Sequence, residues 1–378
     1  MLFRHYDNLG EFLRPGKALV IYGPRQVGKT TLINTFLHET TYKYRLDSGE
    51  NLRIAEILSS GDFEKIKDYV GDYELIVIDE AQKIPNIGSG LKIIVDLFPN
   101  IVVIATGSSS FDLAGQLGEP LTGRKRTLRL FPLSQLELAK TDTRFELKEN
   151  LENYLIYGSY PEVLTAKTKK EKIIVLNELT SSYLLKDIIA LDKIRNNKLI
   201  FNLLRLIAFQ VGSEVSLSEL AKKLGIDYKT VGRYIDILEK SFILFSLHGF
   251  SRNLRKEMTK KHKYYFYDNG IRNALISNFN ALELRDDCGK LWENFLFTER
   301  VKRQVYQEIF SNNYFWRTWD QKEIDFVEER DGKLYGYEFK WGKKNPKPPK
   351  EWFQTYKEAT YEIVNRDNYL DFIVGERE

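Results

Sequence analysis

One short motif constrains this chain more than any other feature. Residues 23–30 read GPRQVGKT, which fits the G-x-x-x-x-G-K-[ST] phosphate-binding template without a mismatch. The apolar run Ala18–Tyr22 before it suits a buried strand, and residues 31–37 after it continue as a helix. In that order, backbone N–H groups and a helix N-terminus face the same anion. The sequence therefore predicts an α/β domain that binds a nucleotide.

The same motif predicts roles for individual side chains. Lys29 is expected to reach the β- and γ-phosphates of ATP, and the Thr30 hydroxyl is expected to bind Mg²⁺. Further contacts to the nucleotide are expected from the loop and the first helical turn: Gly23, Pro24, Arg25, Gln26, Val27, Gly28 and Thr31. The alternative is a glycine-rich turn that carries a lysine by chance, and two later motifs in the right order argue against it.

Two further apolar runs end in polar residues. One ends in Asp79 and Glu80, and the other ends in Thr106, followed by Ser108. Ligands of open parallel sheets bind beyond the carboxyl ends of the strands. We therefore expect Asp79 to hold Mg²⁺ through water, Glu80 to polarise the attacking water, and Thr106 or Ser108 to contact the γ-phosphate or that water. Alternatively, the acids only end a strand and the hydroxyls only cap a helix.

Composition narrows the class of protein. A chain of 378 residues with 43% apolar and 13% aromatic residues is long enough for about two to four domains with real cores. No run of 18 apolar residues exists and the N-terminus lacks the apolar core of a signal peptide, which predicts a cytoplasmic protein without membrane contact. Cys288 is the only cysteine, so an internal disulfide and a cysteine-based zinc site are excluded. Any metal is expected to be a hard ion with oxygen ligands.

The first part of the chain alternates strands with helices. This pattern predicts a parallel three-layer α/β domain over residues 1–145, followed by a helical lid over residues 146–200. A basic loop, residues 122–126, precedes the last strand and is expected to lie near the nucleotide edge of the sheet. The expected strands are Ala18–Tyr22, Tyr42–Asp47, Leu75–Asp79, Ile101–Thr106 and Thr127–Leu130.

A different pattern follows, which predicts a winged helix over residues 201–280. Residues 216–240 read SLSELAKKLGIDYKTVGRYIDILEK, with Ser216 or Ser218 as a cap, two amphipathic helices and a turn at Gly225. Two strand-like runs, residues 242–250 and 263–267, flank a basic loop. We expect exposed side chains on the second helix from Tyr228, Lys229 and Arg233.

The basic loop favours DNA as a partner. Residues 251–263 hold six Lys or Arg against one Glu, and residues 340–350 hold five Lys and no acid. Such clusters suit phosphate contacts, and we expect them from Lys260, Lys261 and Lys263. The alternatives are a solvated basic loop, and a winged helix that binds protein or acts as a spacer.

The last part, residues 285–378, predicts a small α/β domain. A helix is expected over 289–304 and strands over 314–319, 323–329 and 333–341. Asp331 and Gly332 form the strongest short hairpin signal, and this turn fixes the register of the last two strands.

That register places two carboxylates opposite each other. Arg330 faces Lys333, so Asp325 faces Glu338, with Cβ atoms ~5 Å apart, where like charges destabilise a sheet. A bound cation is the natural remedy. The alternative is a cross-strand ion pair between Glu323 and Lys340, with the other two acids solvated.

The first half resembles the AAA-type branch of P-loop ATPases through GPRQVGKT, LIVIDE and ATGSSS. The whole chain is similar to a family of archaeal and bacterial AAA-type ATPases that join this motor to a winged helix and a restriction-endonuclease-like C-terminal domain. The resemblance implies the sheet order 5-1-4-3-2. It also implies a homo-oligomer in which Arg124 acts as an arginine finger on a neighbouring subunit, with Arg126 as the rival candidate.

The C-terminal part resembles the PD-(D/E)xK nuclease superfamily through Glu293, Asp325, Glu338 and Lys340. The resemblance implies that the three acids bind Mg²⁺ and that Lys340 positions the attacking water. The usual proline before the strand acid is absent, since Ile324 stands there.

These features lead to two competing functions. The first is a Mg²⁺-dependent ATPase that couples ATP binding and hydrolysis to action on DNA, with a nuclease module. The second is an ATP-controlled regulatory or assembly switch whose nuclease-like domain is inactive.

Overall fold

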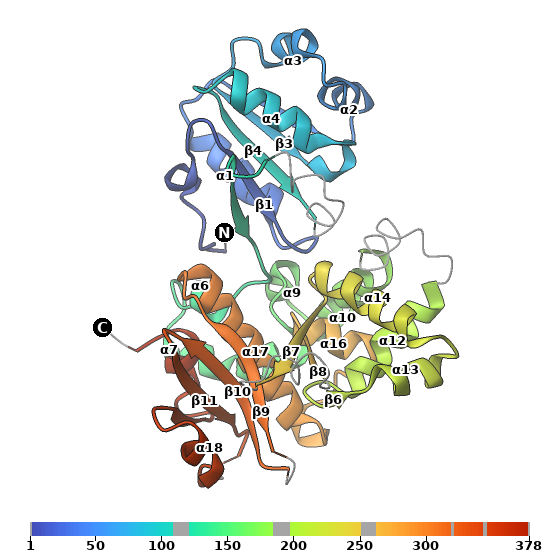
Figure 1. Cartoon of the computed structure of the whole chain (residues 1–378), viewed down its shortest axis with the longest axis vertical. Helices are drawn as coiled ribbons and strands as arrows, with labels where there is room; N and C mark the ends of the chain where they lie inside the picture. Colours follow the sequence, from blue (N-terminus) through green and yellow to red (C-terminus); the bar gives the residue numbers. More distant parts are fainter. Residues whose placement is uncertain are drawn as a thin grey trace. The chain divides into compact units, whose positions relative to one another are not determined.

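The computed structural model describes residues 2–108, 121–183, 197–250, 262–318, 321–342 and 346–376. The chain divides into two compact units (Figure 1). The first consists mainly of Met1–Pro132. The second consists of Leu133–Ser182, Arg195–Glu239 and Ile243–Glu378.

A five-stranded parallel sheet forms the centre of the first unit. Its strand order is β2-β3-β4-β1-β5, which confirms the predicted order 5-1-4-3-2. Two strands have the predicted bounds and the other three differ by one or two residues at each end. The strands are β1 (Ala18–Tyr22), β2 (Tyr44–Ser48), β3 (Leu75–Asp79), β4 (Val102–Gly107) and β5 (Lys125–Arg129).

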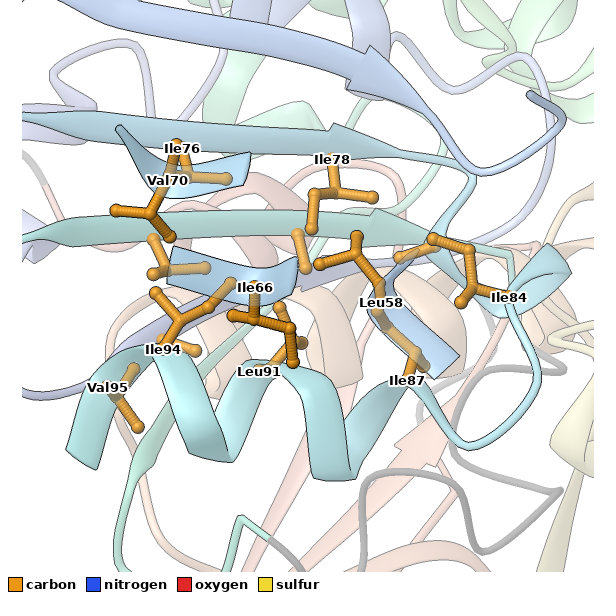
Figure 2. Close-up of a cluster of buried hydrophobic side chains, with 14 of the residues drawn as sticks. Leu58, Ile66, Val70, Ile76, Ile78, Ile84, Ile87, Leu91, Ile94 and Val95 are labelled. Atoms are coloured by element: carbon orange, nitrogen blue, oxygen red, sulfur yellow. The ribbon is translucent and has the colours of Figure 1, made fainter. Parts of the chain in front are cut away.

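Helices cover both faces of this sheet. Helices α2 (Leu52–Ser59), α3 (Phe63–Val70) and α4 (Ile87–Leu97) pack on one face, and Figure 2 shows their apolar side chains meeting those of β3. Strand side chains alternate, so Leu19 and Ile21 point to the opposite face, and they are buried as well. Helix α1 (Lys29–Glu39) follows β1 directly, and two 3₁₀ turns cover Leu9–Phe12 and Ala81–Lys83. The three-layer α/β prediction is thus confirmed for this unit.

The second unit begins with short helices, and capping residues in the sequence mark where three of them start. Ser134, Thr143 and Thr168 each form a capping box with the glutamate three residues later. None of the described helices combines the length and the apolar character needed to cross a membrane. The helices are α6 (Gln135–Leu138), α7 (Arg144–Glu149), α8 (Leu151–Tyr157), α9 (Pro161–Thr165), α10 (Lys169–Glu178), a π-turn at Leu179–Tyr183, α12 (Asn197–Phe209), α13 (Leu217–Leu224), α14 (Tyr228–Lys240), α16 (Asn269–Leu275), a 3₁₀ turn at Leu282–Leu284, α17 (Cys288–Tyr306), α18 (Lys350–Thr355) and α19 (Tyr369–Ile373).

The predicted helix pair forms α13 and α14. Ser216 is the N-cap of α13, and Gly225 ends that helix in the left-handed conformation. On α14, the side chains of Tyr228, Lys229 and Arg233 are exposed, as predicted. The basic loop with Lys260 and Lys261 lies outside the described residues.

A seven-stranded sheet runs through the second unit. Its order is β12-β11-β10-β9-β7-β8-β6, and α17 packs along it (Figure 1). Parallel pairing of β7 with β9, through His248 opposite Tyr314, joins the hairpin of the predicted winged helix to the C-terminal strands. The strands are β6 (Glu214–Val215), β7 (Leu244–Gly249), β8 (His262–Phe266), β9 (Asn312–Arg317), β10 (Glu323–Arg330), β11 (Lys333–Phe339) and β12 (Thr360–Val364).

The hairpin β10–β11 has the predicted register. Arg330 pairs with Lys333 and Phe326 with Tyr337, so the next residues outward, Asp325 and Glu338, lie opposite each other. The two turn residues have φ angles of 50° and 76°, the left-handed values that a primed two-residue turn requires.

Candidate nucleotide site and acidic cluster

The loop between β1 and α1 is shaped as a phosphate cradle. Gly28 caps α1 with φ 97° and ψ 21°, and the loop from Gly23 to Val27 precedes it. A Cβ atom added to Gly23 would lie 1.9 Å from the carbonyl oxygen of Leu130, so glycine is required there by close approach of β5's end. The loop thus lies at the carboxyl edge of the sheet, before the N-terminus of a helix.

The side chain of Lys29, the first residue of α1, reaches back to this loop. Its side chain is buried, and its Nζ donates to the carbonyl oxygens of Gly23 at 2.8 Å and Pro24 at 2.7 Å. The ammonium is therefore held over the loop, the position that contact with the β- and γ-phosphates needs. Next to it, Thr30 and Thr31 are exposed.

Thr30 and Asp79 meet at this edge although they are far apart in sequence. The Thr30 hydroxyl donates to Oδ2 of Asp79 at 2.9 Å, and Oδ1 of Asp79 accepts from the hydroxyl of Thr106. Thr106 is fully buried and its Oγ1 also accepts from the backbone N–H of Glu80 at 3.2 Å. A hydroxyl and a carboxylate side by side are the oxygen donors that Mg²⁺ prefers, so these residues fit the predicted ion.

Glu80 is held by a residue that the sequence analysis missed. Gln82, on the 3₁₀ turn after β3, donates from Nε2 to Oε2 of Glu80 at 2.5 Å and to the hydroxyl of Ser108 at 3.2 Å. The Gln82 amide thus links the hydroxyl of Ser108 to the carboxylate of Glu80. The only local signal was its place two residues after Glu80, which by itself predicts no contact.

Arg124 lies at the other edge of the sheet. Its carbonyl oxygen accepts from the N–H of Ala18 at 2.8 Å, and its Nε pairs with Asp96. Because β5 runs parallel to β1, the loop before β5 lies where β1 starts, whereas the phosphate loop follows the end of β1. The expectation that residues 122–126 lie near the nucleotide edge was therefore wrong. The rival residue, Arg126, lies over the ring of Phe12 at 4.8 Å.

The second unit contains a cluster of four acids, which we call the acidic cluster: Glu293, Glu323, Asp325 and Glu338. They come from α17, β10 and β11. Lys340 pairs with Glu338 at 2.5 Å, next to it on one face of the hairpin. Asp325 accepts a hydrogen bond from the N–H of Phe339 at 2.8 Å. The predicted nuclease-like residues Asp325, Glu338 and Lys340 are thus brought together.

Lys263 is the unexpected member of this region. Its side chain is 3% exposed, its Nζ lies 3.4 Å from Oε1 of Glu293, and it also pairs with Glu323. The prediction that Lys263 contacts DNA phosphates was wrong, because a count of charges along the sequence does not report burial. The predicted alternative pair of Glu323 with Lys340 was wrong too, since Glu323 pairs with Lys263 and Arg317.

The acids of the cluster are not arranged as metal ligands. Throughout the described ranges, no group of three or more His, Cys, Asp or Glu side chains could hold a metal ion. In this arrangement, Glu293, Asp325 and Glu338 do not form such a group. Nor are these acids solvated, because only 13% of the Glu338 side chain is exposed.

Burial changes the protonation of these acids. Burial raises the pKa of Glu293 to about 7, against the opposing charge of Lys263, and raises that of Glu338 to about 6. The pKa of Asp325 is also raised by burial. Burial opposes the charge of Lys263, but the carboxylates around it hold its pKa above the ordinary value. Burial thus makes the charged forms of these three acids less favourable than they are in water.

Comparison with known proteins identifies the first unit's type of domain. Residues 15–139 match the model of an AAA domain. Residues 148–282 and 288–372 match two models described as domains of unknown function, DUF8612 and DUF4143.

Similar proteins occur in bacteria and archaea. An uncharacterized protein of Mycobacterium tuberculosis is 27% identical over 332 residues, which cover 87% of this chain and 71% of that protein. An uncharacterized protein of Methanocaldococcus jannaschii is 24% identical over 335 residues, covering 83% and 73%. A third, from Haemophilus influenzae, is 25% identical over 237 residues, covering 60% and 56%.

Proposed function

Starting from the AAA-type domain at residues 15–139, we propose that this protein is a Mg²⁺-dependent ATPase that works as a homo-oligomer. The observation that supports this best is the meeting of Lys29 and the Thr30–Asp79 pair at one sheet edge. A buried ammonium and two oxygen donors beside a helix N-terminus are suited to a triphosphate with its metal ion.

Each residue of the site has a separate task in this proposal. Lys29 would neutralise charge on the β- and γ-phosphates, while Thr30 and Asp79 would hold Mg²⁺, which would neutralise charge that develops during phosphoryl transfer. Glu80 orients the attacking water and accepts its proton. Thr106 fixes the Asp79 carboxylate through the hydrogen bond between them.

Two variants test this division of labour. Lys29→Ala should abolish ATP binding in calorimetry, whereas Glu80→Gln should keep ATP affinity and lose turnover. Lys17→Ala is the matched control, because Lys17 is exposed and lies before β1, away from the phosphate loop. Equal loss of ATP affinity in the Lys29 and Glu80 variants would show that the role of Glu80 is wrong.

We further propose that hydrolysis is coupled to action on DNA through α13 and α14. The support is the exposed row of Tyr228, Lys229 and Arg233 on α14. DNA should stimulate ATP turnover, and Lys229→Ala with Arg233→Ala should weaken DNA binding and reduce the salt slope by roughly 1–2 units. DNA-insensitive turnover with unchanged binding would favour a switch that contacts protein.

The second candidate function is an ATP-controlled regulatory switch with an inactive C-terminal domain. It is favoured by the acidic cluster, where Lys263 pairs with Glu293 and Glu323. Partner-dependent nucleotide exchange without any DNA cleavage in Mg²⁺ or Mn²⁺ would distinguish it from the first.

A further inference from the structure

The acidic cluster contains a cation that belongs to the chain itself. Lys263 lies on β8, the strand that pairs with β7 in the hairpin of the predicted winged helix. From there its ammonium reaches acids on two other elements, Glu293 on α17 and Glu323 on β10. Its side chain is 3% exposed. A buried ammonium is costly unless it is paired, so these two ion pairs explain why it is tolerated there.

Two side chains of the same strand contact Glu293. Tyr265, two residues after Lys263 and so on the same face of β8, donates its hydroxyl to Oε1 of Glu293 at 2.6 Å. On the other side, a Cβ atom added to Gly212 would lie 3.0 Å from Oε2 of Glu293, so the backbone closes around this carboxylate. Glu293 therefore has an ammonium and a hydroxyl next to Oε1 and the backbone of Gly212 near Oε2, and 16% of its side chain is exposed.

The remaining acids also have partners within the chain. Glu323 lies 3.7 Å from Nε of Arg317 as well as pairing with Lys263. Asp325 accepts from the N–H of Phe339, and Glu338 pairs with Lys340. Within the described structure, Oε2 of Glu338 is buried without a hydrogen-bond partner, but a single oxygen is not a ligand set.

We infer that Lys263 is the resident cation of the acidic cluster, and that its ammonium and a divalent metal ion exclude each other there. Where a nuclease-like site would hold a metal ion, the ammonium of Lys263 from β8 supplies the positive charge instead. This inference is independent of the proposed ATPase activity, because its residues all lie in the second unit.

The test measures Mn²⁺-dependent thermal stability in a Lys29→Ala background, which removes the metal bound with nucleotide. Lys263→Met keeps the length of the side chain without its charge. We expect it to gain a saturable rise in Tm of roughly 5–10 °C at Mn²⁺ concentrations about 100-fold above Kd. Adding Asp325→Asn should abolish this gain. In the Lys29→Ala parent, Asp325→Asn should leave the effect of Mn²⁺ on Tm unchanged.

Lys340→Met is the matched control, because Lys340 pairs with Glu338 at the same hairpin and leaves Lys263 in place. A gain in Lys340→Met but not in Lys263→Met would overturn the inference. So would a folded Lys263→Met that shows no Mn²⁺ effect at all.

A second measurement covers the case in which Lys263→Met does not fold. Electron paramagnetic resonance counts Mn²⁺ bound to the Lys29→Ala protein with and without Asp325→Asn, which keeps an acceptor for the N–H of Phe339. Equal numbers support the inference. A bound ion that disappears with Asp325→Asn shows that metal and Lys263 coexist, and refutes it.

Discussion

Replacing Gln82 with leucine should slow ATP hydrolysis without weakening ATP binding. The Gln82 amide donates to Oε2 of Glu80 at 2.5 Å and to the hydroxyl of Ser108 at 3.2 Å, so it ties the acid to the residue after β4. Leucine has a similar volume but donates nothing. Under the proposed mechanism, Glu80 then loses the group that would fix its orientation toward the attacking water, while the phosphate contacts expected of Lys29 do not involve this amide.

The expected loss of kcat follows from the strength of a hydrogen bond to a charged carboxylate. A hydrogen bond to a charged group contributes about 1.5–3 kcal/mol, and each 1.4 kcal/mol of barrier is about tenfold in rate. We therefore expect kcat to fall roughly 10- to 100-fold, with KM for ATP changed by no more than about twofold. Steady-state phosphate release over a range of ATP concentrations at saturating Mg²⁺ measures both constants.

Two further variants sharpen this test. Lys83→Leu is the matched control, because Lys83 is exposed on the same 3₁₀ turn and should leave both constants unchanged. Gln82→Glu places a second carboxylate beside Glu80, so like charges repel there and turnover should be slower than in Gln82→Leu. An unchanged kcat in Gln82→Leu, or a raised KM at unchanged kcat, would refute the positioning role.

Three other outcomes are expected. Gly23→Ala should cost roughly 1–3 kcal/mol of stability and weaken ATP binding, because the new Cβ would lie 1.9 Å from the carbonyl oxygen of Leu130. Urea unfolding measures the stability and calorimetry measures the ATP affinity. Wild-type values for both would contradict the close approach of the two backbone segments. Burial raises the pKa of Glu293 from 4.5 to about 7, so the native state binds this proton more tightly than the unfolded state does. Glu293 should therefore lower the stability of the wild type by up to about 3 kcal/mol as pH rises through this window. In urea titrations at several pH values, Glu293→Gln should show a smaller slope than the wild type, the remainder coming from Glu338 and Asp325; an identical slope would show that Glu293 does not contribute. Mixing Arg124→Ala with Lys29→Ala subunits should restore part of the ATPase activity if Arg124 acts on a neighbour, and no recovery in mixed oligomers that demonstrably form would count against this role.

The first unit was predictable because its signals are local. Continuous apolar runs mark the buried parallel strands, so β1 and β3 have the predicted bounds. The position of Arg124 was misjudged because the direction of β5, and not its neighbours in sequence, decides the edge at which a loop lies. Gln82 was missed because it contacts Ser108, which follows a different strand: Gln82 lies after β3 and Ser108 after β4.

In the second unit, the turn fixed the pairing of Asp325 with Glu338, because a two-residue primed turn allows a single register. The pairing of β7 with β9 joins residues 248 and 314, and no local pattern connects segments that far apart. Lys263 was misread for the same reason. Its neighbours in sequence are basic, whereas its neighbours in space are acids from α17 and β10.

The shared sheet of the second unit determines where the chain can be divided. The match to the first family of unknown function ends at residue 282, and the match to the second begins at residue 288. These bounds suggest a fragment boundary between the two residues. A fragment that starts there would lose β7 and expose the backbone N–H and C=O groups of β9, and such an open edge invites aggregation. It would also leave Glu293 without the ammonium of Lys263. The two segments are therefore expected to be inherited and exchanged together, and a fragment that begins at Leu133 is the one expected to fold.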